Sequence, residues 1–134
     1  MAKETEDLTC KARFTVRGTD LDPDDVTRLL GVQPTCISRR GDVTKGGQKR
    51  KCGCWIFDSG EPIEDGEKAI EAVVRPFAAK AAELAELRSK GYEVTIWVSH
   101  FAFDGGGYVL KPELLGLCSA LGASLSVSII WLSG

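Results

Sequence analysis

Residues 92–99 read YEVTIWVS, and this stretch decides the fold class because its side chains alternate with the two-residue period of a β-strand. Its apolar face consists of Tyr92, Val94, Ile96 and Val98. The opposite face is polar except for one large aromatic residue, Trp97. The stretch therefore predicts a half-buried strand, with one face against a core and Trp97 on the other face.

Three further strands follow from similar patterns. Residues 11–17 and 125–131 alternate apolar with polar or serine side chains, as half-buried strands do. Residues 54–58 are short, aromatic and bounded by glycine on both sides, which also favours a strand. We therefore expect about four strands in all.

Helices are predicted between these strands. Apolar residues recur every three or four positions from 64 to 90, which indicates a long helix that Pro76 should kink or divide into two abutting helices. A shorter helix should begin at Pro23, where Asp22 offers a capping oxygen, and another at Pro112.

The order is strand, helix, strand, kinked helix, strand, helix, strand. This order predicts an α+β fold: a mostly antiparallel sheet of about four strands with the helices on one face, in a ferredoxin-like arrangement of two β-α-β units joined by a kinked helical segment. The 134 residues suit a single domain, 1–134. Within it we expect a flexible N-terminus at 1–9 and an exposed, basic, glycine-rich loop or loose hairpin at 38–53.

The composition of the chain indicates the cellular location of the protein and the state of its cysteines. The longest candidate, 127–132, is broken by Ser128 and is far shorter than the roughly 18 residues of a membrane span, and residues 1–7 lack the basic and apolar order of a signal peptide. The five cysteines are an odd set without the regular spacing of a disulfide framework. We therefore expect no membrane association, reduced thiols and a cytoplasmic location.

Several short segments, in order along nearly the whole chain, carry a family resemblance. They are the strand and helix at 14–31, Gln33-Pro34-Thr35, Gly41-Asp42 in a basic stretch, Trp55, Arg75-Pro76, the segment 91–94 and the segment 121–125. Together they resemble the bacterial family designated domain of unknown function 4279. The resemblance implies a shared fold but no established activity, cofactor or catalytic residue. Cys52-Gly53-Cys54 departs from the small polar residues expected before the tryptophan, so these cysteines are not a family-wide site.

Metal binding is the first function that the reactive side chains suggest. Cys52 and Cys54, with Cys36, Cys10 or His100, offer the thiolate and imidazole ligands that zinc prefers. Structural zinc sites usually have two paired sets of ligands, and this chain has one pair separated by a single residue. We therefore expect small half-buried cysteines and no metal or other cofactor.

Catalysis is the second alternative. His100, the only histidine, can be drawn with Cys118 or Ser99 and with Asp104 as a base, a nucleophile and an orienting acid. No nucleophile-elbow motif accompanies them, and the glycine run 105–107 lacks the Gly-Lys-Ser/Thr of a phosphate loop. We therefore expect a protein that is not an enzyme.

Charge is concentrated in one segment. Residues 39–51 hold six basic residues and one acid, although the whole chain has a net charge of −2. The basic residues are Arg39, Arg40, Lys45, Lys49, Arg50 and Lys51. A solvated loop needs no partner, but such a segment also suits an acidic protein surface or phosphate groups.

Strand alternation predicts a second surface. If Val94 and its apolar neighbours face the helices, then Trp97, Ile130 and Leu132 lie on the opposite face of the sheet, together with Arg13 and Arg17. Tryptophan and arginine are frequent anchors of protein interfaces. The same face could instead be covered by the segment 38–53 or by a second copy of the chain in a homodimer.

The sequence supports three functional hypotheses. The first is a non-enzymatic protein-binding module that docks a partner through the open sheet face and through Arg39, Arg40, Lys49, Arg50 and Lys51, for example an immunity-type or anti-defence inhibitor that acts by occlusion. The alternative is a small-molecule or anion-binding protein that uses the glycine-rich turn, His100 and the basic residues. Nucleic-acid binding ranks third, because no RNA-binding sheet motif occurs and the chain is acidic overall.

Overall fold

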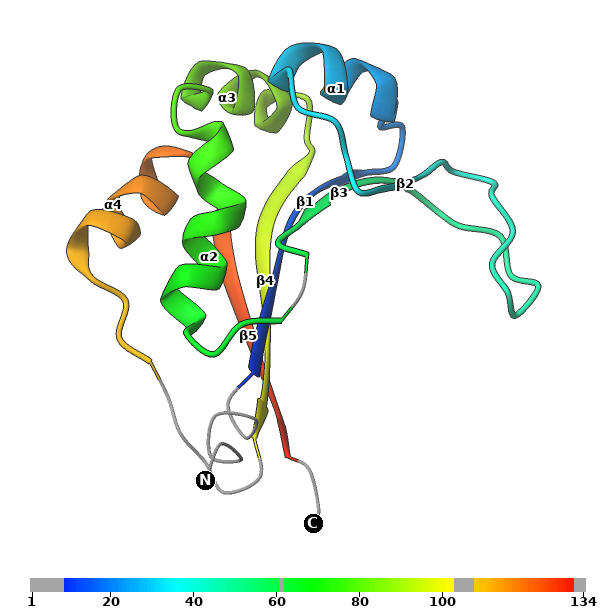
Figure 1. Ribbon diagram of the computed structural model, residues 1–134. Coiled ribbons are helices and arrows are strands. Elements are labelled where there is room, and N and C mark those ends of the chain that lie inside the picture. The colour runs from blue at the N-terminus through cyan, green and yellow to red at the C-terminus, as the bar shows by residue number, and fades with distance from the viewer. Residues whose placement is uncertain (1–8, 61, 103–107, 132–134) are drawn as a thin grey trace.

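The computed structural model in Figure 1 describes residues 9–60, 62–102 and 108–131. The strands are β1 (Thr9–Gly18), β2 (Cys36–Ser38), β3 (Gly53–Asp58), β4 (Glu93–Ala102) and β5 (Ser124–Trp131). The helices are α1 (Pro23–Leu30), α2 (Gly66–Val74), the short 3₁₀ helix η2 (Arg75–Phe77), α3 (Ala81–Ser89) and α4 (Pro112–Ala120). Most of the predicted N-terminal segment, Asp104 and Leu132 lie outside the described residues.

The fold is α+β, with one mixed five-stranded sheet in the order β2-β3-β1-β4-β5. The pairs β2–β3, β3–β1 and β1–β4 are antiparallel, whereas β4 and β5 are parallel. A parallel pair requires a crossover connection, and α4 provides it between β4 and β5. All four predicted strands are present, and β2 is the additional one.

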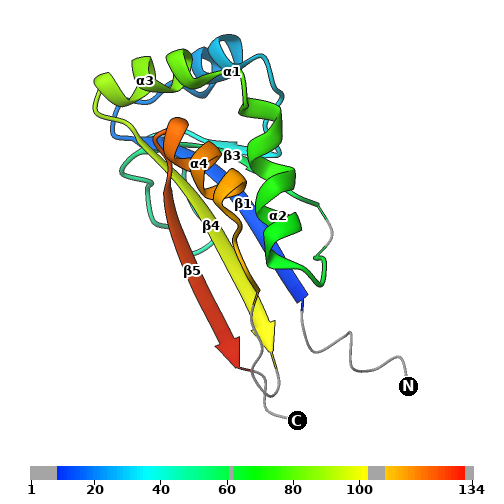
Figure 2. The same cartoon turned by 90° about the vertical axis from the view of Figure 1, so that its left-hand side faces the viewer.

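All the described helices lie on one side of this sheet, as the two views in Figures 1 and 2 show. Residues 64–90 form two helices separated by η2 around Pro76, which confirms the predicted interruption. The cause is the missing N–H of proline and the clash of its ring with the preceding turn. The predicted cap of α1 is also present, since the carboxylate of Asp22 accepts a hydrogen bond from the Asp24 N–H at 3.0 Å.

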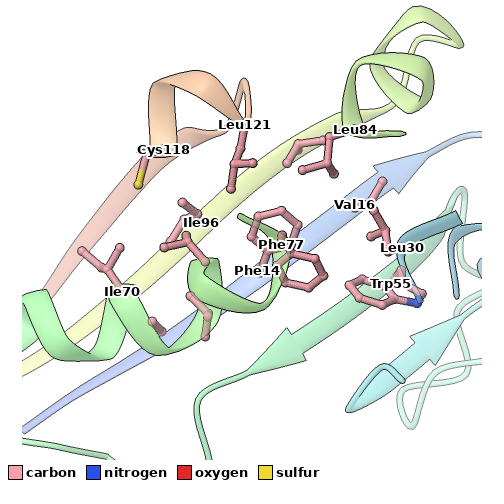
Figure 3. Packing of buried hydrophobic residues seen from close by; sticks show 14 of the residues in the cluster. Phe14, Val16, Leu30, Trp55, Ile70, Phe77, Leu84, Ile96, Cys118 and Leu121 are labelled. Atoms are coloured by element: carbon pink, nitrogen blue, oxygen red, sulfur yellow. The ribbon is translucent and has the colours of Figure 1, made fainter. Parts of the chain in front are cut away.

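The hydrophobic core lies between the sheet and the helices (Figure 3). Phe77 from η2 stacks on Phe14 of β1 with ring centroids 4.3 Å apart, and it also meets Trp55 of β3 edge-on. The buried indole of Trp55 donates its N–H to the Thr27 hydroxyl of α1 at 3.0 Å. Because the core uses one face of the sheet, the alternate residues of each strand are left on the other.

No helix in the described part of the chain combines the length and the apolar character required to cross a membrane.

Candidate docking face

The register of β1 and β4 fixes which side chains occupy the face opposite the helices. Arg13 lies across from Trp97, Thr15 from Thr95, and Arg17 from Glu93. Their chain neighbours Phe14, Val16, Ile96 and Val98 are buried in the core. The predicted strand parity is therefore confirmed, and the Trp97 side chain is 45% exposed on the open face.

A groove of about 310 Å³ lies on this face, over β3, β1 and β4. Its lining includes Arg13, Arg17, Ile56, Glu93 and Trp97. Thr15 and Thr95 line its middle, where the Thr15 hydroxyl donates a hydrogen bond to the Thr95 carbonyl oxygen at 3.0 Å. The groove thus combines a middle lined by threonine, the aliphatic side chain of Ile56, an indole and two guanidinium groups.

The two arginines of the groove have different electrostatic surroundings. Arg17 lies 3.8 Å from the carboxylate of Glu93, with both side chains more than half exposed, so solvent screens their attraction. Arg13 has no carboxylate within salt-bridge distance among the described residues. Arg13 is therefore the cation beside Trp97 that remains available to an anionic group of a partner.

Residues 39–51 form a hairpin that extends β2 and β3. The Gly41 N–H donates to the Arg50 carbonyl oxygen at 2.8 Å, and the Arg50 N–H donates to the Asp42 carbonyl oxygen at 2.7 Å. Nearer the tip, the Thr44 N–H donates to the Gln48 carbonyl oxygen at 2.8 Å. Figures 1 and 2 agree that this basic hairpin extends on the side of the sheet away from the helices.

The basic residues of the hairpin divide into two groups. At its base, Arg39 contacts Asp24 at 2.9 Å and Arg40 contacts Asp20 at 3.0 Å, so both guanidinium groups are held at the start of α1. The other four, Lys45, Lys49, Arg50 and Lys51, are exposed and have no carboxylate partner in the described parts of the chain. These four unpaired residues, not Arg39 and Arg40, present free positive charge.

The remaining predicted docking residues do not all lie in the groove. Ile130 lies opposite Phe101 near the far end of β5, on the same face as Trp97 but outside the lining of the groove. Leu132 lies outside the described residues. Ile56 was missed, although alternation in β3 places it on the open face once its neighbour Trp55 is assigned to the core.

The cysteines remain free thiols. Burial, together with the nearby thiol of Cys52, raises the pKa of Cys54, and burial raises the pKa values of Cys10 and Cys118. A raised pKa keeps a thiol protonated, whereas metal binding and nucleophilic attack require the thiolate. Within the described residues, no group of three or more His, Cys, Asp or Glu side chains is arranged to hold a metal ion.

His100 lies on the helical side of the sheet, away from the groove. It is buried, pairs across the strands with Cys10, and stacks on Tyr108 with ring centroids 5.6 Å apart. The predicted strand ended at residue 99, but β4 continues to Ala102 and the parity of the strand directs the imidazole of His100 toward the core. Asp104 and the glycine run 105–107, which were considered with it, lie outside the described residues.

Comparison with protein-family models finds a match over nearly the whole chain. Residues 8–132 match the model of a family described as domain of unknown function (DUF4279). No curated protein and no solved structure matches the chain.

Proposed function

Because the chain belongs to the DUF4279 family, whose description assigns no activity, we propose from the open sheet face that it is a non-enzymatic module that binds a protein partner. One observation carries this proposal. Trp97 is 45% exposed in a groove, directly across from Arg13, which has no carboxylate partner among the described residues. Covering the exposed part of an indole contributes on the order of 2 kcal/mol to binding, and tryptophan with arginine is a frequent pair of interface anchors.

The charges indicate the chemistry of the partner. Arg13 in the groove and the hairpin residues Lys49, Arg50 and Lys51 lack carboxylate partners in the described part of the protein. A partner with an apolar or aromatic side chain for the groove and an acidic surface for the hairpin would complement both features. We favour inhibition by occlusion, as in immunity-type or anti-defence proteins, because a protein that only covers a surface of its partner needs no catalytic residues of its own.

The experiment is quantitative co-purification of the tagged protein from its cells of origin. Trp97→Glu should remove the partner and leave the melting temperature unchanged, since Trp97 lies outside the core. Leu115→Glu is the matched control, because Leu115 is 46% exposed on α4. If the Trp97→Glu protein retains the same partner in the same amount, the open face is not the docking surface.

A second candidate is a small anionic ligand in the same groove. Its volume of about 310 Å³ is at the lower end of ligand pockets, and two arginines line it. A ligand that binds only the native state raises the melting temperature, so a thermal-shift screen of carboxylates and phosphates separates this function from protein binding. Nucleic acid is a third candidate, whose affinity should fall steeply with salt concentration.

The strand order β2-β3-β1-β4 supports a ferredoxin-like arrangement for the first four strands, with β5 added beyond it by α4. The five free cysteines support a cytoplasmic location.

A further inference from the structure

The strand β5 forms one edge of the sheet, and its outer side is open in the described structure. β5 is last in the strand order and pairs only with β4 among the described strands. A strand at an edge presents a row of N–H and C=O groups that another strand can pair with. The natural complement of this edge is therefore a further β-strand.

The two edges of the sheet differ in how they are protected. β2, at the other edge, is three residues long and leads directly into the basic hairpin, which gives a short edge next to positive charge. β5 has eight residues, SLSVSIIW, without a charged residue, proline or glycine. Proteins usually protect edge strands with charge, proline, bulges or short length. β5 has none of the sequence devices that discourage strand pairing.

Apolar side chains of β5 are exposed on the helical side of the sheet. Leu125 and Val127 lie next to the buried Ile96 and Val98 of β4, which places them on the same face. Val127 is nevertheless 45% exposed and Ile129 is 54% exposed. Figure 2, viewed from the helical side, shows β5 as the outermost strand, with no described helix in front of most of its length.

We propose that β5 pairs antiparallel with β5 of a second copy of this chain, so that the two sheets become continuous. A two-fold axis perpendicular to the sheet keeps the helices of both copies on the same side. The stripes of Leu125, Val127 and Ile129 from the two copies then lie side by side, and each covers the other. The uncharged strand is its own complement, because like charges do not oppose each other across the pair.

This dimer is independent of the proposed docking function. β5 contributes nothing to the lining of the groove, which is formed by β1, β3 and β4. Edge pairing would leave the groove accessible in both copies. It also differs from a homodimer through the open sheet face, which would cover Trp97.

The test is sedimentation equilibrium of the full chain over a wide concentration range, with folding checked by circular dichroism. The expected result is a concentration-dependent mass approaching twice 14.5 kDa. Val127→Lys and, separately, Ile129→Lys should each return the protein to monomer, because a lysine at this edge discourages pairing. Val43→Lys, at an exposed site on the hairpin of the opposite edge, should leave the dimer intact.

Hydrogen exchange provides a readout that does not depend on the variants. Backbone amides of β5 should exchange more slowly as protein concentration rises, whereas those of β2 should not change. A protein that stays monomeric at every concentration overturns the proposal. So does a dimer that persists in both lysine variants, or one that is lost only when Trp97 is replaced by Glu.

Discussion

Arg13 and Trp97 lie directly opposite each other on β1 and β4, and both are on the face of the sheet that the described helices leave open. Arg17, two positions along β1, lies opposite Glu93 and within 3.8 Å of its carboxylate. The uncompensated positive charge of the groove therefore depends more on Arg13 than on Arg17.

For this reason Arg13→Glu should weaken partner binding at least tenfold, which is the scale of an interface anchor. Arg17→Glu makes the same change of charge at a site that already has an acidic neighbour, and it should have a smaller effect. Isothermal titration calorimetry with the identified partner measures both dissociation constants. A larger loss from Arg17→Glu would reverse this assignment.

The unpaired basic residues of the hairpin should mainly affect the rate at which the protein associates with its partner. Replacing Lys49 and Arg50 together by glutamate should lower the association rate constant about tenfold at low salt and much less at high salt, because steering by exposed charge is screened. The pair Lys68→Glu and Lys90→Glu makes an equal change of charge on the helical side. Stopped-flow or surface-plasmon experiments measure the association rate constants. Equal reductions for both pairs of substitutions would rule out a specific role of the hairpin.

The hydrogen bond from Trp55 to Thr27 should contribute to the stability of the fold. Thr27→Val should lower the free energy of unfolding by about 1–3 kcal/mol, because it leaves the buried N–H of Trp55 without its acceptor. Thr27→Ser keeps the hydroxyl and should cost less. Urea denaturation of the two variants measures the difference, and an equal loss in both would show that the hydrogen bond is not the cause.

Alkaline pH should destabilise the protein through its buried thiols. Burial raises the pKa values of Cys10, Cys54 and Cys118 above the ordinary thiol value of 9.0, so above this pH the unfolded chain loses protons that the native chain retains. The free energy of unfolding is then expected to be constant with respect to these thiols below about pH 8 and to fall above about pH 9.

Denaturation series at increasing pH measure this fall, which should be smaller in Cys54→Ala. Cys36→Ala is the control, because Cys36 is exposed. A fall that is unchanged in Cys54→Ala relative to the native protein would contradict the contribution of that thiol.

The sequence predicted the elements whose signal is periodic. β1 and β4 are long enough for alternation to place Arg13 and Trp97 on one face, and the proline rule located the break at η2. β2 was missed because three residues contain too little of a pattern to identify a strand. Its position depends on pairing with β3, which is a tertiary contact.

The salt bridges of the basic hairpin could not be predicted from the sequence either, because they are also tertiary contacts. Arg39 and Arg40 resemble their basic neighbours in the chain, and only the folded structure brings them to Asp24 and Asp20. Alternation likewise placed Val127 on the helical side of β5 but could not show that its side chain stays 45% exposed there. Periodicity determines the face of a residue, whereas the neighbouring elements determine how much of that face is covered.

The central claim is that a partner protein docks on the open face at Trp97. The most direct test places a photo-crosslinking amino acid at position 97, or at the equally exposed position 115, in the cells of origin. We expect position 97 to form an adduct with a different protein and position 115 not to form it. A self-adduct at 97, or the same adducts from both positions, would contradict the claim.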